Sequence, residues 1–152
     1  MHLDFIDKKL INLLQNDSKQ TTKKLSLQLN LSVTAVYERI KKLEKGEVIQ
    51  KYVAIINKHK IDKSFLVFCH IKLIQHSKEF VTTFEREILK LEEVSECFHV
   101  SGEYDYILKV YVKDMDEYRE FMVKKLTAIK HIGSTHSTFA IEEVKNTTLI
   151  NL

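Results

Sequence analysis

The spacing of apolar residues changes once along this chain, and the change limits the folds that the chain can adopt. In the N-terminal part, apolar side chains recur every three or four positions, as on one face of a helix. From Val48 to Ile56 the residues are instead β-branched and aromatic, which is typical of extended chain. Beyond a polar stretch at 57–60, strand-like and helix-like segments alternate. The pattern predicts a small helical domain followed by an α+β domain.

Three helices are expected in the N-terminal part. Asp4 is the expected N-cap of the first, Thr21 or Thr22 of the second and Ser32 of the third, because short oxygen-bearing side chains satisfy the free amides at helix starts. Gly46 is expected to end the third helix in a left-handed conformation. The residues predicted to face the core are Ile6, Leu10, Leu13, Leu14, Leu25, Leu29, Val36, Ile40 and Leu43.

The second part of the chain has the order β-α-β-β-α-β. Strands are expected at 65–74, 95–101, 106–112 and 135–144, with helices at 79–91 and around 118–129. This order is that of a ferredoxin-like domain, with an antiparallel sheet and both helices on one face. The other face of the sheet stays apolar in either register, so we expect a partner to cover it, most simply a second copy.

Charge is divided unevenly between the two parts. Residues 1–60 hold 12 Lys and Arg against 6 Asp and Glu, a net charge of +6, whereas residues 61–152 hold 12 against 15, a net charge of −3. Clustered cations gain free energy by releasing the counterions condensed on nucleic acid. A polyanion is therefore the expected partner of the N-terminal part, and a helix-turn-helix in that part would make the partner double-stranded DNA.

The sequence argues against a membrane protein, a secreted protein, a metal-binding protein and an enzyme. The longest apolar run, Phe65–Cys69, is far shorter than the roughly 18 residues of a membrane-spanning helix. The first residues lack the features of a secretory signal, so a cytoplasmic protein without membrane contact is expected. Cys69 and Cys97 are predicted to be buried thiols, and the histidines lack metal-ligand spacing. No metal, no cofactor and no enzymatic activity are expected.

The segment from Thr21 to Lys42 has the features of a helix-turn-helix, in which the second helix enters the major groove by its N-terminal end. Its first turn is small and polar, as that geometry requires. The residues predicted to face DNA are Ser32, Thr34, Ala35, Tyr37, Glu38, Arg39, Lys41 and Lys42. The alternative is a three-helix bundle with a solvated basic face. Arg39 has a second alternative of its own, which is an ion pair with Asp7 or Glu44 inside the domain.

The segment around Gly102 is the second candidate site. Glycine allows a tight turn whose exposed amides suit a carboxylate, and Asp105 suits an ammonium group, so together they suit an α-amino acid. The hydroxyls of Thr135 and Ser137 share one face of the last strand and could line such a pocket. The alternative is a plain hairpin turn with a structural aspartate and ordinary strand hydroxyls.

Four short motifs occur in order along the chain. They are Leu3–Leu10, similar to LDxxDxxIL; Leu31–Glu44, similar to LSxxxVxxRIKxLE; Gly102–Tyr106, similar to GxYDY; and Glu142–Lys145, which reads EEVK. Together they resemble the Lrp/AsnC family of leucine- and asparagine-responsive regulators over essentially the whole chain. The chain departs from the family pattern at three places: Glu47 stands where glycine is usual, Lys51-Tyr52 replaces Gly-Tyr, and Lys130-His131 replaces Pro-Gly.

The resemblance implies an effector-responsive transcription regulator. Its N-terminal domain, residues 1–50, would be a winged-type helix-turn-helix that binds DNA as a dimer. Residues 51–63 would form a strand and hinge, and residues 64–152 a ferredoxin-like domain for effector binding and oligomerisation. Dimers would assemble further, up to an octamer, with the effector, usually an amino acid, between dimers. The implied effector residues are Ser101, Gly102, Tyr104, Asp105, Thr135 and Ser137.

Two rival functions remain open at this stage. One is an architectural DNA-binding protein that has no physiological ligand. The other is an amino-acid sensor that regulates an enzyme by direct contact, with the helical domain as its docking surface.

Overall fold

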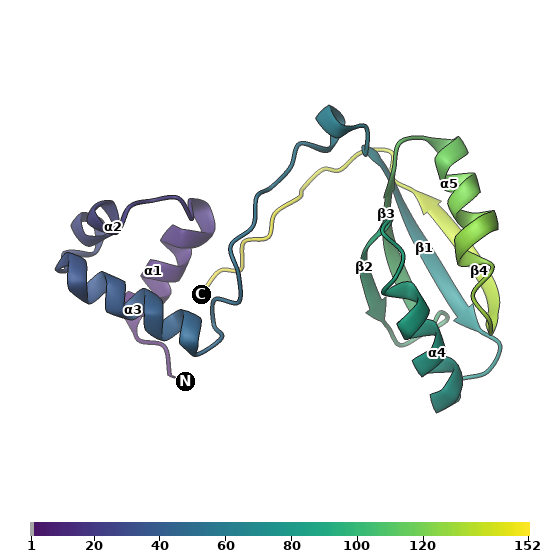
Figure 1. Ribbon diagram of the computed structural model, residues 1–152, viewed down its shortest axis with the longest axis horizontal. Coiled ribbons are helices and arrows are strands. Elements are labelled where there is room, and N and C mark those ends of the chain that lie inside the picture. The colour runs from purple at the N-terminus through teal and green to yellow at the C-terminus, as the bar shows by residue number, and fades with distance from the viewer. Residues whose placement is uncertain (1) are drawn as a thin grey trace. The chain divides into compact units, whose positions relative to one another are not determined.

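The computed structural model describes residues 2–152, and its contacts divide the chain into two compact units (Figure 1). The first unit runs to Ile55 and also includes the C-terminal segment Val144–Leu152. The second unit is Ile56–Glu143. The last residues of the chain therefore belong, by their contacts, with the N-terminal helices.

The first unit contains three helices, α1 (Phe5–Asn16), α2 (Thr22–Leu29) and α3 (Val33–Lys45). Asp4 caps α1 in a capping box, because its side chain accepts a hydrogen bond of 2.7 Å from the Asp7 amide while the Asp7 side chain accepts one from Asp4. Thr21 and Ser32 cap the next two helices. The buried core of this unit consists of Leu10, Ile11, Leu14, Leu25, Leu29, Val36 and Leu43. The predicted three-helix domain is confirmed.

Helix α3 ends in a left-handed residue, but that residue is not glycine. Gly46 has a φ of −83°, so its predicted left-handed conformation is wrong, and the following Glu47 has a φ of 56°. The Glu47 amide donates to the Glu44 carbonyl and the Val48 amide to the Leu43 carbonyl, which is the Schellman pattern. Glu47 thus adopts the conformation that the family's usual glycine would supply.

The segment from Val48 to Ile56 forms no strand with any other part of residues 2–152. Val48 and Ile49 lie in a bend, and their amides donate to the Leu43 carbonyl. The sequence of this segment predicted a strand. Strand residues need a neighbouring strand to pair their backbone N–H and C=O groups, and no other segment of the described chain forms a ladder with this one. A short 3₁₀ helix, η1 (Lys58–Ile61), follows it.

The second unit has the predicted β-α-β-β-α-β order. Its elements are β1 (Phe65–Leu73), α4 (Lys78–Ile88), β2 (Val94–His99), β3 (Tyr106–Val112), α5 (Met115–Phe121), continued by a π-helical turn η2 (Met122–Leu126), and β4 (Ile132–Phe139). The strands lie in the order β2-β3-β1-β4 and all pairs are antiparallel. The ferredoxin-like prediction is therefore confirmed. The last strand was placed too late, since β4 ends at Phe139 rather than at 144.

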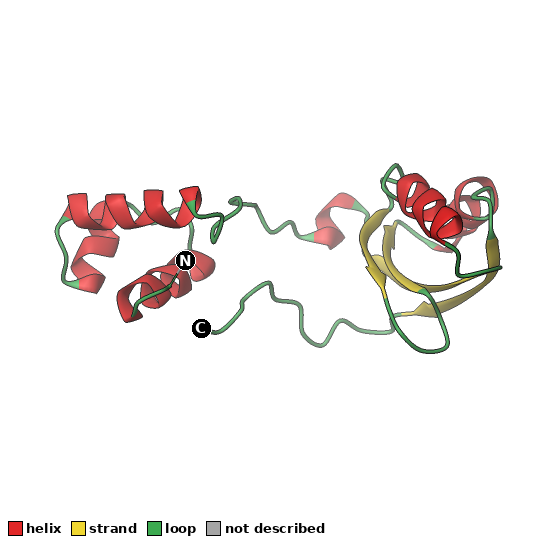
Figure 2. Ribbon diagram, turned by 90° about the horizontal axis from the view of Figure 1, so that it is seen from below, coloured by secondary structure: helices red, strands yellow, loops and turns green. Residues whose placement is uncertain are grey.

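Both helices cover the same face of the sheet (Figure 2). The core between them contains alternate residues of β1 and β3 together with Phe84 of α4 and Phe121 of α5, all buried. Cys69 lies in this core, as predicted, whereas the prediction that Cys97 is buried is wrong. Cys97 is exposed because β2 is an edge strand. No helix among residues 2–152 is both long and apolar enough to cross a bilayer.

His131, just before β4, is another non-glycine residue in a left-handed conformation, with a φ of 72°. Its ring stacks on Phe80, with the two ring centroids 3.7 Å apart and an angle of 10° between the planes. The stacking offsets part of the cost of the backbone conformation, which is about 1–2 kcal/mol for residues with a Cβ. Among the described residues, no hydrogen bond of the Glu47 side chain offsets the cost of its own left-handed conformation.

We expect Glu47→Gly to stabilise the first unit by about 1 kcal/mol, because glycine adopts a positive φ without the clash of a Cβ. Urea unfolding measures the change. The matched control is Lys45→Gly, at the last helical residue of α3, which should destabilise by about 0.5–1 kcal/mol. Destabilisation by both variants would contradict this account of Glu47.

Candidate DNA interface and candidate effector site

Helices α2 and α3 form a helix-turn-helix whose turn is built without glycine. Asn30 takes the left-handed conformation there, with a φ of 53°, and asparagine tolerates it better than most residues. The Leu31 amide then donates to the Ser26 carbonyl over 3.1 Å, closing the end of α2. Val36 and Leu43 of α3 are fully buried against the other helices. These contacts fix which face of α3 points outward.

The outward face of α3 is polar and cationic. The exposed residues on it are Thr34, Tyr37, Glu38, Lys41 and Lys42, and Ala35 is half-buried. The Ser32 hydroxyl accepts a hydrogen bond of 3.1 Å from the Ala35 amide, so it serves as a helix cap. Val33, which the sequence reasoning did not select, is 48% exposed in the first turn. It adds an apolar group, of the kind that contacts thymine methyls, at the leading end of the helix.

Arg39 lies at the edge of this face and is held inside the domain. Its NH1 nitrogen is 2.8 Å from Asp4 and 2.5 Å from Asp7. Of the alternatives, the ion pair with Asp7 is therefore present, whereas Glu44 contacts Lys41 and Tyr52 instead. The bonds to Asp4 and Asp7 raise the pKa of Arg39. The Asp7 amide and Arg39 together hold the pKa of the Asp4 carboxyl below its usual value.

The two lysines of the face remain accessible. Lys42 lies 3.8 Å from Asp7 and Lys41 3.3 Å from Glu44, and more than half of each lysine side chain is exposed. Ion pairs at such exposure are worth little, about 0–1 kcal/mol. Both ammonium groups can therefore exchange these partners for a phosphate.

The hairpin between β2 and β3 contains the second candidate site. Gly102 has a φ of 125°, a conformation that side chains rarely allow, and a Cβ there would meet no atom within 4 Å. The Val100 amide donates to the Asp105 carbonyl, and the Asp105 amide donates to Ile71 of β1. The turn is thus both fixed at its base and open to solvent at its tip.

The Asp105 carboxylate is already engaged. Its Oδ2 accepts a hydrogen bond of 2.7 Å from the Leu73 amide, and its Oδ1 lies 3.2 Å from His76 Nδ1. The Leu73 amide, and after it the His76 imidazole, hold the pKa of Asp105 below its ordinary value. Asp105 therefore ties the hairpin to the end of β1, as expected of a structural aspartate, while its other carboxylate oxygen faces His76.

Sequence reasoning missed the histidines beside Asp105. The His76 ring lies 5.4 Å from that of His99, and the His99 ring stacks on Tyr106, with centroids 4.6 Å apart. His99 Nδ1 is also 4.0 Å from Glu85. No spacing in the sequence indicated this cluster, because it depends on how β2 pairs with β3. Among residues 2–152, no three His, Cys, Asp or Glu side chains are placed to share a metal ion.

The remaining predicted effector residues do not form one cluster within this copy of the chain. Tyr104 packs against His70 and His136, with ring centroids 5.0 and 6.2 Å away. Ser137 pairs in register with buried Cys69 and so faces the helices, where its hydroxyl lies 2.5 Å from that of Tyr118. Thr135 lies two residues before Ser137, on the same face. Ser101 and Gly102 are exposed.

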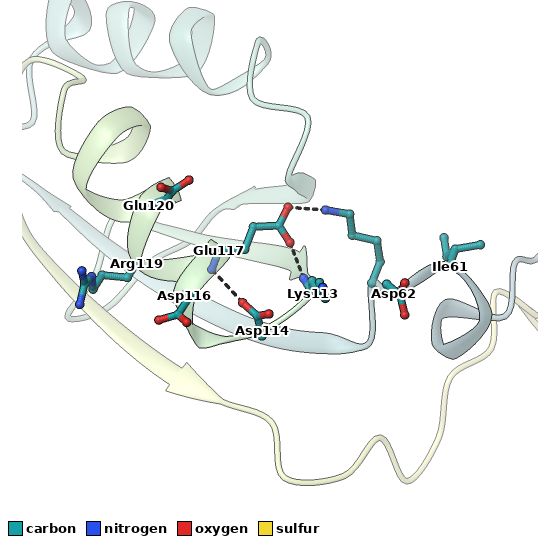
Figure 3. A pocket seen from close by; sticks show the side chains of 9 residues that line it. Ile61, Asp62, Lys113, Asp114, Asp116, Glu117, Arg119 and Glu120 are labelled. Atoms are coloured by element: carbon teal, nitrogen blue, oxygen red, sulfur yellow. Dashed lines mark hydrogen bonds and ion pairs between the residues drawn. The ribbon is translucent and has the colours of Figure 1, made fainter.

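A separate hollow of about 510 Å³ lies between the start of β1 and α5 (Figure 3). Acidic groups dominate its lining, but Glu117 is already neutralised, since it accepts from Lys63 Nζ and from the Lys113 amide over 2.5 Å each. The lining residues are Ile61, Asp62, Lys63, Lys113, Asp114, Asp116, Glu117, Arg119 and Glu120. None of them was predicted to bind a ligand.

A helix-turn-helix with an exposed cationic face, joined to a ferredoxin-like domain, defines a two-domain DNA-binding transcription regulator. Residues 3–44 match the AsnC-type helix-turn-helix domain, and residues 66–150 match the Lrp/AsnC ligand binding domain. The chain belongs to the Lrp/AsnC family of transcription regulators. It therefore combines DNA binding with a domain that binds a small effector.

The relatives share both halves of the chain. The leucine-responsive regulatory protein of Escherichia coli is 38% identical over 143 residues, which cover 94% of this chain and 87% of the relative. An AsnC family regulator from Agrobacterium tumefaciens has a TM-score of 0.93 at 34% identity, covering 97% of this chain and 96% of its own. A regulator from Neisseria meningitidis in complex with L-Met also has a TM-score of 0.93, at 27% identity, covering 99% and 96%. These relatives are regulators rather than enzymes, in agreement with the prediction.

Proposed function

We propose that α3 enters the major groove of DNA with its N-terminal end and supplies the sequence-reading surface of this regulator. The observation that carries the proposal is the exposed face of α3, which combines small hydroxyl and apolar groups at its start with two exposed, weakly paired ammonium groups further along. Small groups at the leading end allow the helix backbone to approach base edges, and the lysines match the phosphates that flank the groove.

Each residue of this face has a proposed role. Thr34, Ala35 and Glu38 read base edges, with Tyr37 beside them. Lys41 and Lys42 contact phosphates, as do the Ser32 hydroxyl and Arg39. One guanidinium nitrogen of Arg39 is held by Asp4 and Asp7, but the group has five N–H donors, and those that remain can reach a phosphate.

The double variant Lys41→Glu, Lys42→Glu should bind DNA roughly tenfold more weakly or worse, because it replaces two phosphate contacts by repulsion. The slope of log affinity against log salt concentration should become shallower by about 2. Fluorescence anisotropy with duplex DNA from the promoter of the protein's own gene measures both quantities. The matched control is Lys90→Glu, Lys124→Glu, an equal change of charge in the second unit, where both lysines are more than half exposed. An equal loss of affinity in the control would exclude a specific role for the two lysines of α3.

The effector is proposed to be an amino acid bound at the Gly102 hairpin. Its ammonium group would take the place of His76 at the free side of Asp105, and its carboxylate would bind the open amides near Ser101 and Gly102. Tyr104, Thr135 and Ser137 would line the remainder of the site. Within one chain Tyr104 packs on the sheet face of His70 and His136 whereas Ser137 lies on the other face, so the site would need residues from more than one copy. Two similarities support this class of ligand: the L-Met complex of the Neisseria regulator and the name of the leucine-responsive relative.

A thermal-shift screen of the twenty amino acids should find at least one that raises the melting temperature, since a ligand that binds only the folded state stabilises it. Asp105→Ala should abolish the shift while leaving DNA affinity intact. His76→Ala should keep or enlarge the shift, because it removes the competitor for the carboxylate. A response that survives in Asp105→Ala would place the ligand elsewhere. Silence of the wild type across the whole panel would favour an architectural DNA-binding protein.

The protein is proposed to act in the cytoplasm as a homodimer, in which the sheet face opposite the helices packs against its counterpart. That face is formed by alternate strand residues and includes Phe68, Phe98 and Ile107. Phe98 is 51% exposed in the single chain, although large aromatic side chains gain free energy by burial. Dimers are proposed to assemble further, up to an octamer, as the family resemblance implies.

Phe98→Lys should convert the dimer to monomers, since it places a charge in the middle of the proposed apolar contact. Light scattering coupled to size-exclusion chromatography measures the mass. Leu89→Lys is the matched control, because Leu89 is 86% exposed and lies at the end of α4, away from this face. A dimeric Phe98→Lys protein, or a wild type that is itself a monomer, would overturn the proposal.

A further inference from the structure

The C-terminal segment Val144–Leu152 has no secondary structure, yet its contacts group it with the N-terminal helices rather than with the domain that precedes it. The contact is centred on one side chain. Gln15, near the end of α1, accepts a hydrogen bond of 2.8 Å from the Ile150 amide and donates one of 2.9 Å to the Ile150 carbonyl. These two bonds imitate the paired bonds of a β-ladder.

The apolar packing around the contact between Gln15 and the Ile150 main chain is loose. A hollow of about 610 Å³ lies between α1, residues 48–55 and the C-terminal segment, and Leu14, Tyr52 and Leu152 are among the residues that line it. Ile150 remains 70% exposed and Leu152 50% exposed. A segment with two directed bonds and little buried apolar surface is held in place, but it can detach at a small cost in free energy.

We propose that the C-terminal segment Val144–Leu152, called the strap below, docks reversibly on α1 through Gln15. We further propose that the DNA-binding unit has its full affinity only while the strap is docked. The strap follows β4 after four residues, Ala140–Glu143, and is therefore covalently continuous with the ligand-binding unit. Its hydrogen bonds to Gln15 make it, when docked, a second connection to α1 besides the segment after α3. A change in the position of β4 is therefore transmitted directly, through the strap, to α1 of the first unit.

The route continues from α1 to the DNA-binding helix. The helix that carries Gln15 also carries Asp7, whose buried carboxylate binds Arg39 and lies near Lys42 of α3. When the strap is docked, α1 is held at both ends: by the capping box and Arg39 at its start, and by Ile150 at its end. A detached strap leaves the second end free, and the population of the DNA-binding arrangement falls.

Hydrogen–deuterium exchange tests the contact between Gln15 and Ile150 without any ligand or DNA. In the full-length wild type the Ile150 amide should be protected, and in Gln15→Ala its exchange should be about tenfold faster, because both directed bonds are lost. Asn16→Ala is the matched control, since Asn16 is the next residue of α1 and its amide bonds only to Asn12. An unprotected Ile150 amide in the wild type, or equal exchange in Gln15→Ala, would overturn the proposal.

A locked strap tests the consequence for DNA. In a Cys97→Ser background, which removes the exposed native thiol, Gln15→Cys and Ile150→Cys can be joined by a short bismaleimide. The bridge should form within one chain, and the bridged protein should bind promoter DNA at least about threefold more tightly than Gln15→Ala. The unbridged double variant should resemble Gln15→Ala. A bridge between two chains, no bridge at all, or equal affinities of bridged protein and Gln15→Ala would each refute the strap, whatever α3 does on DNA.

Discussion

The buried carboxylate of Asp7 is the constraint on which the N-terminal unit depends. Its side chain is only 1% exposed, and Arg39, whose NH1 nitrogen lies 2.5 Å away, balances its charge and ties α3 to the start of α1. Leaving such a charge without its partner costs about 3–5 kcal/mol, which is much of the stability of a small domain. The same carboxylate also completes the capping box of α1. One side chain therefore fixes the start of the first helix, the orientation of the third and the position of the basic groups beside it.

Periodicity and capping predicted most of the fold because both are local. The apolar spacing identified all three N-terminal helices, and oxygen-bearing side chains marked their starts at Asp4 and Ser32. Features that depend on distant partners were not predictable in this way. The segment from Val48 to Ile56 has the composition of a strand, but composition does not supply a neighbouring strand. The left-handed Glu47 was missed for another reason, since the neighbouring Gly46 carried the stronger local signal.

The two candidate sites differ in how much of them could be predicted. A helix has one outward face once its core residues are known, so the surface of α3 followed from the positions of Val36 and Leu43. The hairpin site depends on sheet register, and register brings together residues that no spacing connects. His76 reaches Asp105 only because β1 ends beside the base of the hairpin. Conversely, the family resemblance grouped Ser137 with Tyr104, although the Ser137 hydroxyl is directed toward Tyr118 beneath the helices.

The uneven division of charge between the two parts of the chain affects how the molecule searches a genome. The basic helical part is attracted to every stretch of phosphate backbone, whereas the acidic part is repelled by it. Electrostatic attraction therefore favours encounters in which the basic part meets the duplex. A sequence-independent attraction of this kind weakens as salt is added, and the acidic part of the chain does not contribute to it.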